Sequence, residues 1–175
     1  LLKERPGVVH AACWAHVRRK FHEARLVGEP AADKPLKLIG HLYKAHQRVD
    51  AFVSDLCRRT ARYGQNLSQD RIDEIVVDRR RKWAGRWIKY LQDWNHQARI
   101  DALPKGKLGT AIGYLHSQGP RLALYLSHAR TDLDNNVIER AIRPIAIGRK
   151  NWLFAGSEDG AERAALLISL VGTCR

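Results

Sequence analysis

Two long amphipathic segments joined by a short polar turn constrain the fold of this sequence more than any other feature. In residues 35–62 apolar side chains recur three or four positions apart, which is the spacing of one face of an α-helix. The second segment begins after Ser68, a residue suited to cap a helix, and carries apolar residues on one side as far as Trp94. Residues 63–66 form the turn between them. Two helices with so short a connection are expected to pack antiparallel as a hairpin.

Further helices are expected on both sides of this hairpin. One begins at Trp14 and ends before Pro30, and a weaker one runs from about residue 105 to 117 and stops at Gly119-Pro120. Residues 31–130 are therefore predicted to be all helical.

The two ends of the sequence contain strand-like pieces. The Val8-Val9 run fits a buried strand. Near the other end, a helix that follows Asp134 is expected to stop at Arg143, because the residue before a proline is pushed away from helical geometry. Residues 145–154 are expected to form an alternating stretch, a basic turn and an extended piece, before Ser157 caps a final helix.

The charge balance points to an anionic partner. The sequence has 31 Lys and Arg against 18 Asp and Glu, a net charge of +13. Such an excess is typical of nucleic-acid binding, although binding to a ribosome or to a membrane surface would leave the same mark. Three widely spaced cysteines imply no disulfide framework and favour a cytoplasmic protein. No window resembles a membrane span of roughly 18 or more apolar residues.

Cations and aromatic residues alternate between Asp78 and Trp94. One row predicts a stripe that faces the core: Trp83, Trp87, Leu91 and Trp94. Another row predicts a solvated face: Arg79, Lys82, Arg86 and Lys89. A face with four cations and no anion also suits a DNA backbone, which it would bind without sequence preference and with strong salt dependence.

One carboxylate, Glu139, stands among asparagines and cations in DNNVIERAIRPIAIGRKNWLF. With Asn136 as N-cap, Glu139 would occupy the position of a capping box and reach back to the cap's own amide. Alternatively, Asn135, Asn136 and Glu139 direct oxygen ligands at a divalent metal. Four cations would then contact phosphate: Arg140, Arg143, Arg149 and Lys150. The local spacing favours the capping box, and it permits the metal site without requiring it.

His10, Cys13 and His16 lie three residues apart in HAACWAHVRRKF. A structural zinc site usually needs four ligands, and no second close pair is present. A buried cysteine beside a hydrogen-bonded histidine is favoured, and no metal is assigned to these residues.

Two blocks together resemble the transposases of the insertion sequence 66 family. They are AACWAHVRRKFHEA (residues 11–24) and DNNVIERAIRPIAIGRKNWLFAGSEDGAERAA (residues 134–165), about a quarter of the chain. Family members carry a Cys-Trp-Ala-His-x-Arg-Arg-Lys-Phe block followed by an Asp-Asn-Asn-x-x-Glu-Arg block.

The resemblance implies a mainly α chain that holds the C-terminal part of a ribonuclease-H-like α/β catalytic core, interrupted by an all-helical insertion. Residues 1–30 would supply a core strand and the Cys-x-x-His helix. Residues 31–130 would be the insertion. Residues 131–175 would supply the helix of the third carboxylate and the C-terminal part of the core.

The same resemblance implies an Asp-Asp-Glu triad that binds two Mg²⁺ or Mn²⁺ ions for DNA cleavage and strand transfer. Glu139 matches the third carboxylate, and thus a catalytic and metal-binding residue. Supporting roles would fall to four residues: Asn135, Asn136, Cys13 and His16. The family's two aspartates come upstream of the Cys-Trp-Ala-His block, whereas no aspartate precedes Asp33 in this sequence, and Asp33 follows that block.

The expected protein is therefore a fragment of a DNA transposase whose beginning lies upstream, and which is inactive alone. Its partners would be DNA, as transposon ends and target, and either itself or an intact transposase, with no membrane. One alternative is a non-catalytic module that binds DNA or interferes with intact transposase. Another is an inert remnant that misfolds because its strand edges are unpaired.

Overall fold

The computed structural model describes residues 9–151 and 157–173, and in these residues the regular structure is helical. The longer helices are α1 (Trp14–Leu26), α2 (Asp33–Arg62), α3 (Gln69–Asp101), α4 (Lys107–Ala123), α5 (Asn136–Asn151) and α6 (Glu158–Thr173). Two short 3-10 turns, η1 (Pro30–Ala32) and η2 (Leu124–Leu126), precede α2 and follow α4. The prediction of a mainly α chain is confirmed. The chain divides into two compact units, Leu1–Asp134 and Asn135–Arg175, which are described separately.

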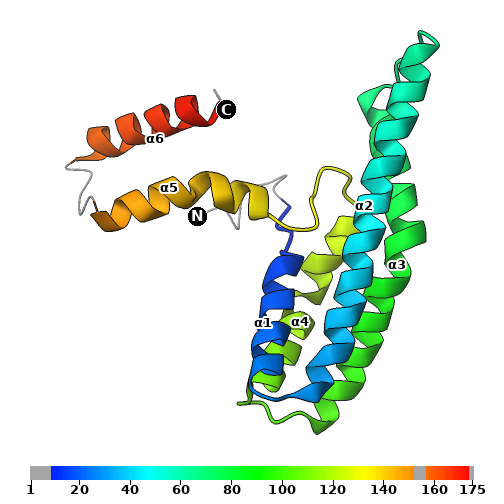
Figure 1. The fold of residues 1–175 in the computed structure, drawn as a ribbon, viewed down its shortest axis with the longest axis vertical. Coiled ribbons are helices and arrows are strands. Elements are labelled where there is room, and N and C mark those ends of the chain that lie inside the picture. Colours follow the sequence, from blue (N-terminus) through cyan, green and yellow to red (C-terminus); the bar gives the residue numbers. More distant parts are fainter. Residues whose placement is uncertain (1–8, 152–156, 174–175) are drawn as a thin grey trace. The chain divides into compact units, whose positions relative to one another are not determined.

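The helical hairpin is the central feature of the first unit. Helices α2 and α3 run side by side in opposite directions, joined by a short turn (Figure 1). Gly64 in this turn has φ +70°, a conformation that favours glycine. The Ser68 hydroxyl accepts a hydrogen bond from the Arg71 amide at 3.3 Å, as an N-cap does. The predicted hairpin and its cap are confirmed.

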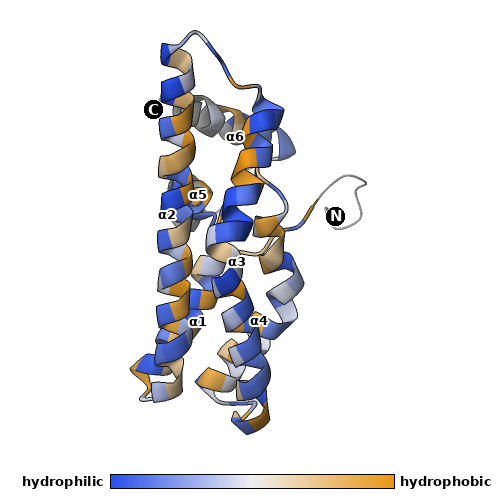
Figure 2. Ribbon diagram, turned by 90° about the vertical axis from the view of Figure 1, so that its right-hand side faces the viewer, coloured by the Kyte–Doolittle hydropathy of each residue, from blue (hydrophilic) through white to orange (hydrophobic). Residues whose placement is uncertain are grey.

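One hydrophobic core holds α1, the base of the hairpin and α4 together. Helix α1 contributes Trp14, Val17, Phe21 and Ala24, all almost fully buried. The Phe21 ring packs edge-on against Trp94 of α3, with 5.6 Å between ring centroids. Hydrophobic and hydrophilic residues alternate along the helices in Figure 2, as helices with one buried face require. The predicted division into residues 1–30, 31–130 and 131–175 stays a prediction, which limited proteolysis tests.

The hairpin extends beyond this core. Its buried residues lie within Pro35–Val49 of α2 and Arg80–Asn95 of α3. Between Asp50 and Arg79 every residue is exposed or only half-buried. We call residues 50–79 the distal arm; they form the end of the hairpin that projects past α1 and α4 in Figure 1.

Two helices continue through prolines that were expected to stop them. Helix α4 runs through Pro120 to Ala123, because Leu122 and, just after it, Tyr125 are buried in the core. Their burial offsets the cost of an internal proline, which is about 3 kcal/mol. Helix α5 likewise runs through Pro144 to Asn151, so the predicted stop at Arg143 and the turn at residues 148–151 are wrong. A proline only disfavours helical geometry before it, and hydrogen bonds elsewhere in the helix can hold it.

No strand occurs in residues 9–151 or 157–173. Val9 lies in irregular chain and is 49% exposed, so the predicted buried strand is wrong at this residue; Val8 and Trp152–Phe154 lie outside the described residues. The Ala12 amide donates to the carbonyl of Arg121 near the end of α4, and the Trp14 amide donates to the carbonyl of Leu133 in the loop before Asp134.

The second unit contains α5 and α6. The Ser157 hydroxyl accepts a hydrogen bond from the Gly160 amide at 3.1 Å, and the Ala161 amide donates to the Ser157 carbonyl. The predicted cap of the final helix is confirmed.

Candidate functional site

Glu139 lies in the first turn of α5. The helix begins at Asn136, and the Glu139 amide donates to the Asn135 carbonyl at 2.9 Å. Asn135 therefore stands at the N-cap position, one residue before the cap assumed in the predicted capping box, and the contact of the Glu139 carboxylate with a backbone amide stays a prediction. The carboxylate of Glu139 remains close to the amide end of the helix, where the helix dipole favours negative charge.

Glu139 does not belong to a complete metal site within the part of the chain that the structure describes. No group of three or more His, Cys, Asp or Glu residues lies together among those residues. A catalytic metal pair is held by several oxygen ligands. The described residues therefore do not fit the metal pair by themselves, and Glu139 could supply one ligand of a larger set.

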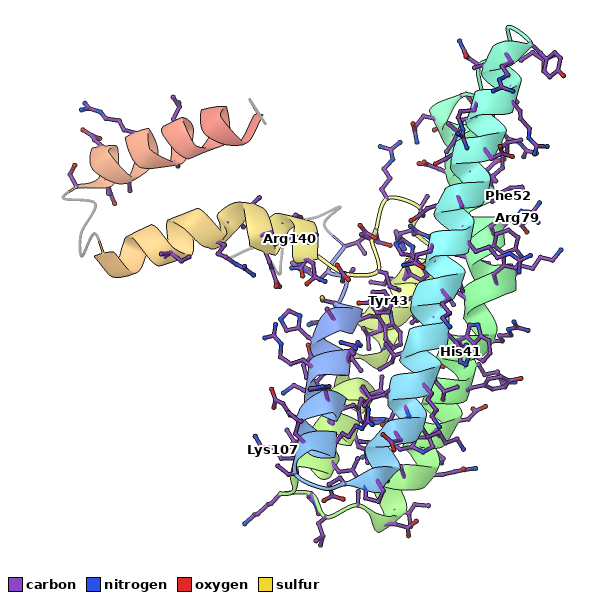
Figure 3. All side chains as sticks on the ribbon, in the orientation of Figure 1. His41, Tyr43, Phe52, Arg79, Lys107 and Arg140 are labelled. Atoms are coloured by element: carbon purple, nitrogen blue, oxygen red, sulfur yellow. The ribbon has the colours of Figure 1, made fainter. Side chains whose placement is uncertain are left out.

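Two of the four cations that follow Glu139 have described side chains. Arg140 and Arg143 are exposed on α5 (Figure 3 labels Arg140). Arg149 and Lys150 belong to the last turn of α5, but the structure does not describe their side chains. Arg140 and Arg143 are thus accessible to a phosphate.

Cys13 and His16 lie at the start of α1, and both are half-buried. Cys13 occupies the N-cap position in an extended conformation, and its side chain makes no capping hydrogen bond. The next residue, Trp14, donates its amide to the Leu133 carbonyl at 3.1 Å. This contact joins the Cys-Trp-Ala-His block to the residue just before Asp134.

Asp134, the first residue of the second block, is also bound within the first unit. The Tyr43 hydroxyl donates to its Oδ2 atom at 2.9 Å. Burial raises the pKa of Tyr43 well above its usual range, and the hydrogen bond to Asp134 raises it further. Tyr43 therefore stays protonated and keeps donating to Asp134 at neutral pH.

The four predicted DNA-binding cations of α3 differ in exposure. Lys82, Arg86 and Lys89 are exposed. The Arg79 guanidinium is half-buried at 4.7 Å from the Phe52 ring centroid and 5.7 Å from that of Trp83 (Figure 3). Part of the Arg79 side chain therefore packs against aromatic rings and is less accessible than the other three cations.

The predicted aromatic stripe lies at the edge of the core. Leu91 is fully buried, while Trp83, Trp87 and Trp94 are half-buried and pack against the core. The most buried row of α3 runs instead through Arg80, Ala84, Ile88, Leu91 and Asn95.

Sequence reasoning missed Arg80, which is 5% exposed. Its Nη1 atom lies within hydrogen-bond distance of the carbonyl oxygens of Tyr125, His128 and Thr131. The signal was its position four residues before Ala84, on the apolar row of the helix. The run of arginines and lysine at residues 79–82 hid it.

The two sequence blocks and the family match assign the chain to a class, the proteins of insertion-sequence transposition. The model of the transposase IS66 family matches residues 2–163, so the chain belongs to this family. Both sequence blocks fall in the matched range, apart from the last two residues of the second.

Curated relatives come from Sinorhizobium fredii (strain NBRC 101917 / NGR234). The uncharacterized protein y4hP is 31% identical over 174 residues, which cover 96% of this chain and 29% of the relative. The uncharacterized protein y4qI is 32% identical over 166 residues, which cover 94% of this chain and 27% of the relative. The chain thus spans less than a third of the length of these relatives. No solved structure matches it. Among the described residues, no helix is long and apolar enough to cross a membrane.

Proposed function

We propose that the chain is part of a DNA transposase that cleaves DNA and transfers strands during movement of an insertion sequence. The observation that carries this proposal is the family match over residues 2–163, which includes Glu139 in its Asp-Asn-Asn-x-x-Glu-Arg context. In the whole protein, Glu139 would be the third carboxylate of a ribonuclease-H-like core that uses Mg²⁺ or Mn²⁺. DNA, as transposon ends and target, would be the partner.

We further propose that these 175 residues do not cleave DNA alone. Glu139 has no group of metal ligands around it within residues 9–151 and 157–173. One carboxylate does not hold a pair of divalent ions.

The test compares this chain with a longer protein that contains it. The 175-residue chain should show no Mg²⁺- or Mn²⁺-dependent cleavage, and the longer protein should cleave a duplex that carries the ends of its insertion sequence. Glu139→Gln in the longer protein should reduce cleavage to background while DNA binding is retained. Glu158→Gln, an exposed glutamate in the first turn of α6, is the matched control and should retain activity. Full cleavage by Glu139→Gln would refute its catalytic role.

A second candidate function is a non-catalytic module that binds DNA or associates with intact transposase. The net charge of +13 and the exposed Lys82, Arg86 and Lys89 favour it. Co-purification of the chain with an intact transposase, and lower transposition when the chain is co-expressed, would support it. Unchanged transposition with no association would exclude interference.

A further inference from the structure

A band without carboxylates runs along both helices of the hairpin base. Residues 34–49 of α2 and residues 79–92 of α3 contain no Asp or Glu. They contain ten cations: Lys34, Lys37, Lys44, Arg48, Arg79, Arg80, Arg81, Lys82, Arg86 and Lys89. Where the two stretches pack together, the hairpin brings Lys44 and Arg48 of α2 close to Arg86 of α3.

Within this band, side chains of both helices line one open cavity of about 180 Å³. We call it the stacked-cation groove; it is lined by His41, Lys44, Arg48, Trp83, Arg86 and Trp87. His41, labelled in Figure 3, lies on the α3 side of α2. Of the four α3 cations predicted from the sequence, Arg86 lines the groove, and α2 supplies Lys44 and Arg48 opposite it.

Aromatic rings hold the arginines of the groove in place. The Arg48 guanidinium carbon lies 4.3 Å from the centroid of the Trp83 ring, and that of Arg86 lies 4.6 Å from the Trp87 ring. The His41 ring stacks on Trp87 with 4.5 Å between centroids and 15° between planes. A guanidinium stacked on an indole keeps the N–H donors of its edge available, in a fixed plane.

The cations of the groove are not neutralised by neighbours. Within the described part of the chain, no carboxylate lies within 4.0 Å of the side-chain nitrogens of Lys44, Arg48 or Arg86. Farther along α2, by contrast, Asp55 pairs with both Arg58 and Arg59. The groove therefore presents preorganised positive charge without an internal counter-ion.

We propose that the stacked-cation groove binds backbone phosphates of duplex DNA, an inference that rests on the DNA-binding role proposed above. Planar guanidinium edges bind phosphate oxygens with two parallel hydrogen bonds, and Lys44 adds a point charge beside them. Lys82 and Lys89 lie one turn away from Arg86 on the same helix and extend the contact along the backbone. Single-stranded DNA fits less well, because proteins bind it by stacking bases on aromatic rings, and here Trp83 and Trp87 are already stacked by protein side chains.

The test is a fluorescence-anisotropy titration of the 175-residue chain with a labelled duplex of about 30 base pairs at salt concentrations from about 50 to 200 mM. The groove variant is Arg48→Gln with Arg86→Gln. Its matched control is Arg58→Gln with Arg59→Gln, which removes the same charge from exposed arginines outside the groove. A single strand of the same length is titrated in parallel.

The groove variant should bind duplex at least about tenfold more weakly than the control. The slope of log affinity against log salt should become less negative by about 1 to 2, because each phosphate contact contributes about −0.9 to it. Circular dichroism checks that each variant is folded. If the double variant unfolds, Lys44→Gln replaces it, because, among the described residues, no ring contact of Lys44 would be lost. This substitution should make the slope less negative by about 1.

Three outcomes overturn the proposal, and they are distinct. Equal affinities of the folded groove variant and the Arg58/Arg59 control would show that the groove does not bind DNA, while the chain itself still does. Tighter binding of the single strand than of the duplex would refute the assignment to duplex phosphates. Absence of salt-dependent binding by the parent chain would refute both the groove and the DNA-binding role of this chain.

Discussion

The Arg80 Nη1 atom lies 2.8 Å from the carbonyl oxygen of Thr131, 51 residues farther along the chain. The same nitrogen lies 3.1 Å from the His128 carbonyl and 3.3 Å from that of Tyr125. The guanidinium carbon also lies 4.2 Å from the Tyr125 ring centroid. One buried side chain thus contacts three backbone carbonyls, from Tyr125 in η2 to Thr131 in the irregular segment after it.

Replacing Arg80 should therefore destabilise the first unit strongly. We expect Arg80→Leu to lower the free energy of unfolding by about 2–4 kcal/mol, because the buried Tyr125 carbonyl and the half-buried Thr131 carbonyl lose this donor. Lys82→Ala, an exposed neighbour, should change it by less than about 0.5 kcal/mol. Urea unfolding followed by circular dichroism measures both. Equal effects of the two substitutions would contradict the structural role of Arg80.

The hydrogen bond from Tyr43 to Asp134 predicts a loss of stability in alkali. Burial, and then this bond, raise the pKa of Tyr43 in the folded chain above its ordinary value near 10. The unfolded chain therefore loses the proton first as the pH rises, and the free energy of unfolding falls above about pH 10. Below that pH the contribution is fully present.

Tyr43→Phe should cost about 1 kcal/mol at neutral pH and should make the alkaline decline less steep than in the parent. Urea unfolding at about pH 8 and pH 11 measures the difference. Tyr63→Phe is the control, because Tyr63 is 84% exposed. If the free energy of unfolding declines equally in alkali for the parent and for Tyr43→Phe, Tyr43 has the same pKa in the folded and the unfolded chain, and the prediction is wrong.

Two glycines of α4 should respond in opposite directions to alanine. A Cβ atom at Gly109 would overlap the carbonyl oxygen of Leu103, whereas a Cβ atom at Gly113 would meet nothing within 4 Å. Gly113→Ala should raise the free energy of unfolding by about 0.5–1 kcal/mol. Gly109→Ala should lower it by about 1–3 kcal/mol, because the turn before α4 must shift. Thermal unfolding of both variants checks the signs; a stabilising Gly109→Ala would refute the close approach.

Limited proteolysis should retain α1 with the rest of the first unit. Phe21 and Ala24 are fully buried against the other helices, so cleavage after them requires the shared core to open. We expect the longest-lived fragments, identified by mass spectrometry, to contain residues 14–26. Phe21→Ala, which should cost about 3–5 kcal/mol, should expose them earlier. Early loss of α1 with survival of residues 31–130 would instead support the division predicted from the sequence.

The sequence predicts the hairpin and its caps because these depend on local patterns. Apolar spacing and a single hydroxyl at Ser68 or Ser157 determine where a helix lies and begins. The helix ends predicted from Pro120 and Pro144 were wrong, because a proline indicates only the local backbone preference. Whether the chain continues as a helix depends also on tertiary packing, such as the burial of Leu122.

The candidate site divides in the same way. The motif around Glu139 is visible in the sequence because it is contiguous. Arg80 and the α2 wall of the groove were missed because their roles depend on residues distant in sequence: Thr131 for Arg80, and Trp83 for Arg48. A stretch of cations looks alike whether its members face solvent, a ring or a backbone carbonyl.

The distal arm has a consequence for how the first unit opens. Apart from an ion pair between Asp73 and Arg130, its helices pack mainly against each other, while residues 35–49 and 80–95 also pack within the shared core. The hairpin should therefore unfold locally from the turn at Gly64 toward Val49 and Arg80, while the base of the hairpin stays folded. Amide hydrogen exchange should be fastest near the tip and slow progressively toward Val49 and Arg80, so that one pair of helices spans the range from local fraying to global stability.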